Sequence, residues 1–194
     1  GFPQFNKNWT YPGFEGKPIQ IAVFSRAEEV EVLINGKPIG RKKVSFEAPV
    51  PNLVEFEATY QPGEIEAISY FGGKEVSRDL LCTAGQAAQI KLSCSKKALM
   101  SDGHDAAFVM IDVLDEQGML VPDAEIKLNA KVDGAASLAG FGSGNPITDE
   151  DYTDNQTVTY KGHACAILRS GYDKGKTILT ISAQGLDEKT ITLD

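Results

Sequence analysis

The chain has 194 residues, of which 42% are hydrophobic and 24% charged, and it carries a net charge of −8. This balance is ordinary for a globular protein of one large or two small domains. It argues against a nucleic-acid surface, which needs a basic stripe, and against a polybasic membrane anchor. The sequence contains no run of about 18 apolar residues, which is the length needed to span a bilayer.

Aromatic residues gather at the start of the chain, at Phe2, Phe5, Trp9, Tyr11 and Phe14. The stretch is rich in Asn, Pro and Gly, has no strand pattern and holds the only tryptophan. Such a density of aromatic side chains indicates a surface that packs against something. Three interpretations remain open: docking on this chain's own sheet, packing on a neighbouring domain of a larger protein, or a platform that stacks on sugar rings.

The most informative stretch is Glu29–Val44, which predicts a strand, a two-residue turn at Asn35-Gly36 and a returning strand. Asn-Gly between apolar alternations is a strong hairpin signal, because a type I′ turn needs positive φ at both central residues. Ser25–Val30 alone invites a helix, and the β-rich run after it cuts that helix short. The strands expected in this half are Ile19–Phe24, Val30–Ile34, Pro38–Val44, Val54–Tyr60, Ile65–Tyr70 and Glu75–Cys82.

The alternation breaks near Thr83, and we place a domain boundary at Ala84-Gly85, so that the domains are 1–84 and 85–194. Alternating strands with frequent turn signals, in halves of this size, are typical of immunoglobulin-like sandwiches. The sequence therefore predicts an all-β protein of two tandem immunoglobulin-like β-sandwich domains. The strands expected in the second half are Ala88–Cys94, Phe108–Leu114, Met119–Val121, Ile126–Val132, Leu138–Phe141, Val158–Tyr160, Ala164–Leu168, Thr177–Ala183 and Lys189–Leu193.

The longest stretch without strand signal is Gly142–Thr157, and a loop of this length is usually functional or poorly ordered. The glycines in Gly140–Gly144 resemble a nucleotide-binding loop, but the GxGxxG pattern needs a glycine where the chain has Asn145, and no helix pattern follows. The acidic tract Asp149–Asp154 could gather oxygen ligands around calcium. Because it lacks the EF-hand spacing, a solvated acidic loop is favoured, with calcium as the alternative.

A search for chemistry finds no catalytic residue, metal site or cofactor motif. His104 and His163 are far apart and lack a nucleophile in motif context. The three cysteines, Cys82, Cys94 and Cys165, are odd in number and widely spaced, so they are read as small buried hydrophobes. Carboxylates such as Glu55 and Glu57 alternate along expected strands, and this pattern favours solvated faces over a paired glycosidase acid and base.

The residues of the first half resemble a known family. Four stretches resemble the domain that follows the catalytic barrel in bacterial β-galactosidases of glycoside hydrolase family 2. They are Lys17-Pro18-Ile19, the hairpin Glu29–Lys42, Tyr60–Ala67 and Gly73–Val76. The aromatic segment around Trp9 is similar to the segment that leaves the barrel in that family.

The second half resembles the last domain of the same family, in Leu99–Asp105, Val109–Gly118, Val121–Ala124 and Leu138–Pro146. Part of it, Asp102–Pro122, also resembles the immunoglobulin-like repeats of invasin-type adhesins. The first-half hairpin tips the balance toward the glycosidase, because adhesin repeats do not carry it.

The resemblance implies a non-catalytic accessory region of a β-galactosidase that packs on a barrel outside this chain. It implies that barrel as the partner, with carbohydrate as a second candidate partner, and it suggests a periplasmic or secreted bacterial protein. The charge and the lack of a long apolar run argue against nucleic acid and membrane as partners. A carbohydrate-binding module and an adhesin stalk are the alternatives. The candidate interdomain or sugar contacts are Trp9, Tyr11, Phe14, Phe141, Asn145 and Tyr152.

Overall fold

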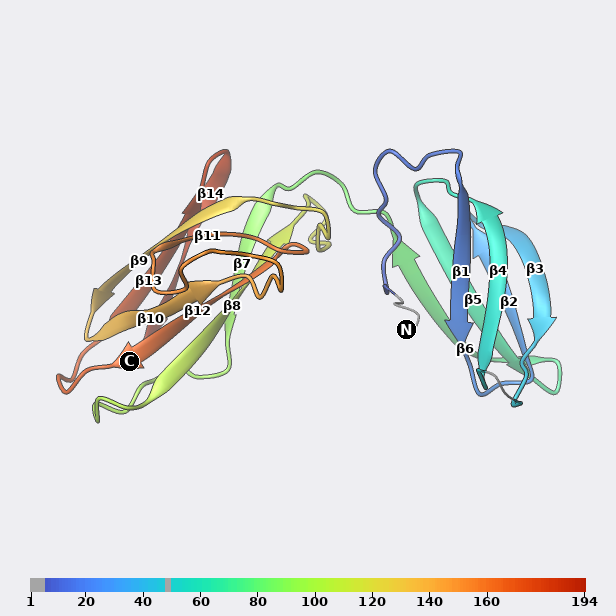
Figure 1. The fold of residues 1–194 in the computed structure, drawn as a ribbon. Helices are drawn as coiled ribbons and strands as arrows, with labels where there is room; N and C mark the ends of the chain where they lie inside the picture. Colours follow the sequence, from blue (N-terminus) through green and yellow to red (C-terminus); the bar gives the residue numbers. More distant parts are fainter. Residues whose placement is uncertain (1–5, 48–49) are drawn as a thin grey trace. The chain divides into compact units, whose positions relative to one another are not determined.

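The structure is a computed structural model that describes residues 6–47 and 50–194; within these residues it contains strands and no helix. No helix of the described residues could therefore cross a membrane. The chain divides into two compact units, Gly1–Thr83 (unit 1) and Ala84–Asp194 (unit 2). In each unit two sheets face each other (Figure 1), which confirms the predicted all-β sandwich class.

Unit 1 has a two-stranded sheet, β1-β4, and a four-stranded sheet, β3-β2-β5-β6. Its core lies between them and includes Ile21 and Phe56 from the small sheet and Val30 and Val32 from the large one. The alternation of these residues with polar ones places them all on the inner faces. The strands of unit 1 are β1 (Pro18–Phe24), β2 (Glu29–Ile34), β3 (Lys37–Lys43), β4 (Leu53–Thr59), β5 (Glu64–Phe71) and β6 (Lys74–Cys82).

The predicted hairpin is confirmed. Asn35 and Gly36 have φ of 50° and 74°, and Ile34 pairs with Lys37 across the two-residue turn. The Asn35 side chain also accepts a hydrogen bond from Glu64 N (2.8 Å) and donates one to Pro62 O (3.0 Å). The turn that joins β2 to β3 therefore also holds the start of β5.

Unit 2 consists of two four-stranded sheets, β10-β12-β8-β7 and β11-β9-β13-β14, with a larger core than unit 1. Val109, Ile111, Ala166, Leu168 and Leu179 are fully buried between the sheets. The strands are β7 (Gln89–Cys94), β8 (Ala106–Leu114), β9 (Lys127–Gly134), β10 (Ala136–Gly142), β11 (Gln156–Val158), β12 (His163–Ser170), β13 (Thr177–Ala183) and β14 (Leu186–Leu193).

One expected strand is wrong: Met119–Val121 forms no strand, and only an isolated bridge joins Leu120 to Leu114. The reason is the tight turn before it, in which Asp115 N donates to Met119 O and Gly118 N donates to Asp115 O. After this turn the chain pairs with the end of β8 through the single bridge of Leu120 with Leu114. A second turn follows at once, in which Ala124 N donates to Val121 O.

Candidate functional site

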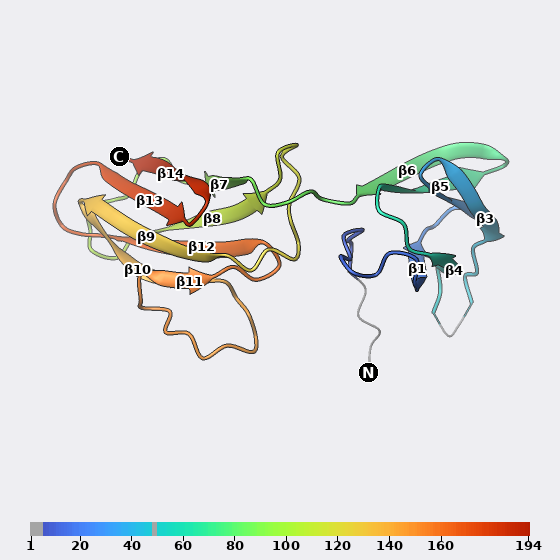
Figure 2. The same cartoon turned by 90° about the horizontal axis from the view of Figure 1, so that it is seen from above.

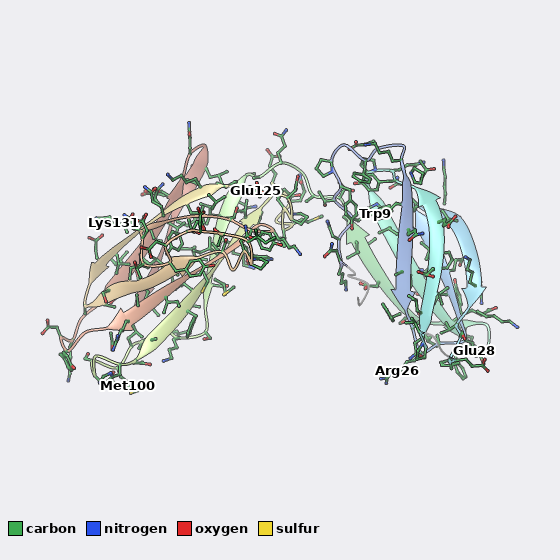
Figure 3. The ribbon with its side chains drawn as sticks, in the orientation of Figure 1. Trp9, Arg26, Glu28, Met100, Glu125 and Lys131 are labelled. Carbon is green, nitrogen blue, oxygen red and sulfur yellow. The ribbon has the colours of Figure 1, made fainter. Side chains whose placement is uncertain are left out.

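The aromatic start of unit 1 packs on that unit's own core. The indole of Trp9 is 3% exposed and meets Tyr60 edge-on, with ring centroids 5.1 Å apart (Figure 3). The residues 6–17, called the lead-in segment, are also tied to β6 by the ion pair of Lys7 with Asp79 (2.8 Å). Phe2 and Phe5 lie outside the described residues. For Trp9, the structure therefore supports the first of the three interpretations given above, which is packing on this chain's own sheet.

Tyr60, which sequence reasoning did not single out, is the hub of the lead-in segment. Its ring is 1% exposed, and its hydroxyl donates to Trp9 O (3.1 Å) and accepts from Tyr11 N (3.2 Å). Thr83 Oγ1 donates to the same Trp9 carbonyl (2.7 Å) and accepts from Gly63 N (3.0 Å). One buried phenol and one hydroxyl thus join the lead-in segment, the end of β4 and the end of β6.

Tyr11 and Phe14 form the outer part of this aromatic group. The Tyr11 ring lies edge-on to Tyr60 (5.7 Å between centroids), and burial raises the pKa of the Tyr11 phenol above its usual value. Phe14 is 47% exposed, with the Lys17 ammonium 4.9 Å from its ring centroid. Of the candidate contacts in unit 1, Phe14 is therefore the one with a face open to solvent.

The Trp9 indole nitrogen is the unusual polar atom of unit 1. It is buried, and no hydrogen-bond partner for it lies among the described residues. Buried polar groups are ordinarily paired, since an unpaired one costs about 1–3 kcal/mol. The hydrophobic burial of the indole and its contact with Tyr60 have to offset this cost.

An open groove of about 570 Å³ lies where the narrow β1-β4 sheet leaves β3 uncovered. Lys42 spans it: its ammonium donates to Glu55 O on β4 (2.8 Å) and lies 5.0 Å from the Phe56 ring centroid. A lysine over an unpaired strand edge is a common protection against edge-to-edge association. We therefore interpret Lys42 in this groove as protection of the strand edge, and we do not interpret the groove as a ligand site.

The outer face of the β3-β2-β5-β6 sheet is a charged network. Arg41 pairs with Glu29 (2.7 Å) and covers the Tyr70 ring at 3.7 Å, while Tyr70 donates to Glu31 (2.8 Å). That hydrogen bond is the main cause that raises the pKa of Tyr70. Arg78 bridges Glu66 and Glu75 beside it. These long side chains surround Ile68, which is only 4% exposed on this face, while Leu80 beside Glu66 stays 48% exposed.

The candidate loop of unit 2, residues 143–155, connects β10 to β11 and runs outside both sheets (Figure 2). It is built by short-range bonds: Asn145 Oδ1 accepts from Ile147 N (3.0 Å), and Asp151 Oδ1 accepts from Thr153 N (2.8 Å). The Thr153 bonds lower the pKa of the Asp151 carboxyl. These carboxylate and amide oxygens are used to fold the loop on itself.

Two longer contacts fasten the loop to the edges of both sheets. On one side Phe141 N, on the free edge of β10, donates to Tyr152 O (2.7 Å). On the other side Glu150 accepts from Val158 N and from the Thr157 hydroxyl, both at 2.9 Å. The loop thus spans the open side of the sandwich and satisfies backbone groups at both edges.

The glycines before the loop serve Tyr152. A Cβ on Gly142 would lie 2.6 Å from the Tyr152 ring, so the ring rests directly on the backbone of β10. Phe141, between Gly140 and Gly142, points to the opposite face of the sheet, where it is 1% exposed in the core. Of the unit 2 candidates, Tyr152 (46% exposed) is open to solvent, Asn145 is half-buried and Phe141 is inaccessible.

The histidine and cysteine side chains of the described residues do not converge on a reaction centre. His163 Nδ1 lies 2.8 Å from Asp112 Oδ1, while His104 lies in the turn formed by Asp102 and Asp105. Cys82, Cys94 and Cys165 are free and half-buried. Among residues 6–47 and 50–194 no group of three or more His, Cys, Asp and Glu side chains could hold a metal ion.

Comparison with known proteins covers almost the whole chain. Residues 90–192, more than half of the chain, match the family model "Glycoside hydrolase family 2 C-terminal domain 5", and residues 16–77 match a domain of unknown function (DUF4982). The β-galactosidase BoGH2A of Bacteroides ovatus is 33% identical over 99% of this chain and 22% of its own length. A β-galactosidase of Thermoanaerobacter pseudethanolicus is 31% identical over 96% of this chain and 25% of its own.

The likeness extends to solved structures and to relatives with more than one named activity. A glycosyl hydrolase family 2 member from Bacteroides cellulosilyticus superposes with a TM-score of 0.94 at 30% identity, covering 99% of this chain and 24% of that one. A β-glucuronidase of Formosa agariphila is 23% identical over 96% of this chain and 19% of its own length. The chain thus spans about a fifth to a quarter of the relatives it matches.

Proposed function

Because this chain belongs to glycoside hydrolase family 2, we propose that it is the non-catalytic accessory region of a β-galactosidase, packed on a catalytic barrel in the same parent polypeptide. The observation that carries the proposal is the form of the match. The whole chain aligns with a part of a β-galactosidase that amounts to 22% of that relative's length.

The geometry supports an accessory role. A glycosidase needs two carboxyl groups about 5–10 Å apart across a cleft. Several carboxylates of this chain have structural partners instead: Glu29 and Glu66 bind arginines, and Glu150 and Asp151 bind backbone amides. Among the candidate contacts, Phe14 and Tyr152 have exposed aromatic rings and are then available to a neighbouring domain.

The test is hydrolysis of nitrophenyl β-galactoside by the purified 194-residue chain and by the parent protein. We expect turnover by the parent and none by the chain. Turnover by the chain that survives repurification would overturn the non-catalytic assignment. If the parent cleaves glucuronides instead, the proposed substrate changes and the accessory role stands, because a β-galactosidase and a β-glucuronidase both match this chain.

Carbohydrate binding is a second candidate function, and its remaining basis is the exposure of Phe14 and Tyr152, at 47% and 46%. Aromatic faces open to solvent can stack on sugar rings. The burial of Trp9 and Phe141 removes those two rings from such a platform, and the Tyr11 ring is half-buried and packs edge-on against Tyr60. Titration calorimetry of the chain with galactose, lactose and galactans tests it, and flat titrations would eliminate it.

A further inference from the structure

The two outer faces of unit 2 differ in polarity. The outward positions of the β11-β9-β13-β14 sheet follow from its register and are mostly hydrophilic, with Lys131 pointing into solvent (Figure 3). The large apolar side chains exposed on this face are Ile178 and Val158, at 39% and 38%. This face has the alternation of a sheet with one wetted side. Its polar members are Lys127, Asn129, Lys131, Asp133, Thr180, Ser182, Thr190 and Thr192.

The outer face of the β10-β12-β8-β7 sheet is apolar at its centre, on β8 and β12, whereas the outward positions of the edge strand β7, Gln89, Lys91 and Ser93, are polar. On β8, Phe108 and Met110 point outward and are 57% and 44% exposed. Their partners on β12 are Ile167 and Cys165, both half-buried, and Gly142 next to Cys165 carries the Tyr152 ring. Phe108, Met110, Cys165 and Ile167 lie on the adjacent strands β8 and β12, and Tyr152 of the loop lies over β10 beside them. These five side chains are called the apolar face below.

Polar groups border the apolar face at both ends of the strands. At one end His163 bonds to Asp112, and Lys91 lies beside Asp112 on β7. At the other end Arg169 donates to Gly103 O (3.0 Å). An apolar centre with a polar rim is the usual composition of an interface between proteins or domains.

We propose that the apolar face is where unit 2 docks against a domain of the parent polypeptide that lies outside these 194 residues. The inference rests on the proposed function, because that function supplies the neighbouring domain. The relatives, four to five times longer than the matched segment, contain ample chain for such a domain. A wetted face would carry polar side chains at these positions, as the opposite sheet does.

Size and charge favour this occupant over a second copy of the chain. Five partly exposed side chains offer on the order of a few hundred Å² of apolar surface, whereas a stable interface between free proteins buries about 800 Å² on each partner. A tethered domain needs less, because its effective concentration is high. Two copies would also bring together chains of net charge −8 each.

The experiment is oxidative footprinting of methionines in the isolated chain and in the parent protein, read by mass spectrometry. Met110 reports the apolar face, and Met100, 66% exposed in the turn before β8, is the internal control (Figure 3). In the isolated chain we expect both sulfoxides to form at rates within about twofold of each other. In the parent we expect the Met110 rate to fall about fivefold or more while the Met100 rate stays within about twofold.

Equal Met110 rates in the chain and the parent would overturn the inference. Protection in the isolated chain that grows with its concentration would overturn it too, in favour of a second copy. Galactosidase activity of the same parent preparation separates the two proposals. An active parent with unprotected Met110 removes the docking inference alone, whereas a parent without glycosidase activity removes the proposed function.

A pair of matched variants gives an independent readout in the parent. Phe108→Ser should lower the midpoint of the parent's thermal unfolding and speed proteolytic release of unit 2. Ile178→Ser, on the polar outer face, should change neither. Both variants should leave the isolated chain folded, since both side chains are exposed there. Equal effects of the two variants in the parent would contradict the docking face.

Discussion

At the residue scale, a few side chains hold segments that have no strand pattern of their own. Asn35 fastens a turn to the start of β5, and the Tyr60 hydroxyl fastens the lead-in segment to the core. The Asn35-Gly36 turn was predictable from the sequence, because Asn-Gly specifies a turn locally, whereas the bonds of Asn35 to Glu64 and Pro62 were not. The Tyr60 role was hidden, because it depends on partners 49 and 51 residues away.

The hairpin turn has a direct mutational test. Replacing Asn35-Gly36 by Val-Val puts β-branched residues at φ of 50° and 74° and removes both Asn35 hydrogen bonds. We expect a loss of about 2–4 kcal/mol in the unfolding free energy of unit 1. Urea denaturation followed by circular dichroism measures it. Asn35→Asp, which keeps the turn preference and the acceptor for Glu64 N, is the control; an unchanged midpoint for Val-Val would contradict the turn's importance.

Asp115 makes the stability of unit 2 depend on pH. The carboxylate is 2% exposed and accepts from Gly85 N (2.8 Å), Met119 N (2.8 Å) and Gln117 N (3.0 Å). These backbone bonds, with that from Gly85 first, lower its pKa below the ordinary 3.8. Because the folded-state pKa is depressed, the stabilisation is complete above pH ~4 and is lost as pH falls through the folded-state pKa.

Asp115→Asn should therefore cost about 1.5–3 kcal/mol at pH 7, because an amide offers one acceptor oxygen where the carboxylate offered two. The difference from the unmodified chain should shrink as the pH is lowered from about 4 toward 2. Urea midpoints across this range measure it, with the exposed Asp187→Asn as the control. A difference that stays constant down to pH 2 would argue against the carboxylate's charge.

At the element scale, the strands were predictable and the segments that protect them were not. Period-2 patterns located thirteen of the fifteen expected strands, because each strand buries one face; Val158–Tyr160 overlaps β11 at Val158 alone, and Met119–Val121 forms no strand. The run Ala106–Leu114 also held a missed signal: its apolar residues at consecutive positions indicate a strand that is covered on both faces. The loop 143–155 gave only composition, since its contacts with β10 and β11 are tertiary.

The Glu150 contact tests whether this loop stabilises the sheet edge. Glu150→Ala leaves Val158 N and the Thr157 hydroxyl without that acceptor, and Thr157 is buried. We expect a loss of about 1–3 kcal/mol in the stability of unit 2. Asp149→Ala, one residue earlier and exposed, should be close to neutral. Chemical denaturation of both variants measures the difference, and equal effects would mean that the loop does not stabilise the edge.

At the scale of the whole molecule, family resemblance predicted more than local patterns could. The hairpin Glu29–Lys42 and the stretch Leu138–Pro146 pointed to glycoside hydrolase family 2, and the comparisons confirm that family. The candidate contacts were harder, because exposure is decided by tertiary packing. Trp9 and Phe141 are in cores, whereas Phe14 and Tyr152 remain predictions as contacts.

The independence of the two units stays a prediction that expression can test. Unit 2 has its own core of thirteen buried residues, with cores of this kind usually sufficient for a domain of its size. We expect Ala84–Asp194, expressed alone, to melt cooperatively with β-type circular dichroism. A non-cooperative melt would show that unit 2 needs unit 1 or the parent to fold.

The single tryptophan makes the chain its own spectroscopic label. Trp9 is buried in unit 1 against Tyr60, and unit 2 contains no tryptophan. Fluorescence excited at the red edge of the indole band therefore reports on unit 1 alone, while the far-ultraviolet signal averages both units. A stopped-flow or equilibrium comparison of the two signals would assign each unfolding transition to its unit without a dye, a tag or an added chromophore.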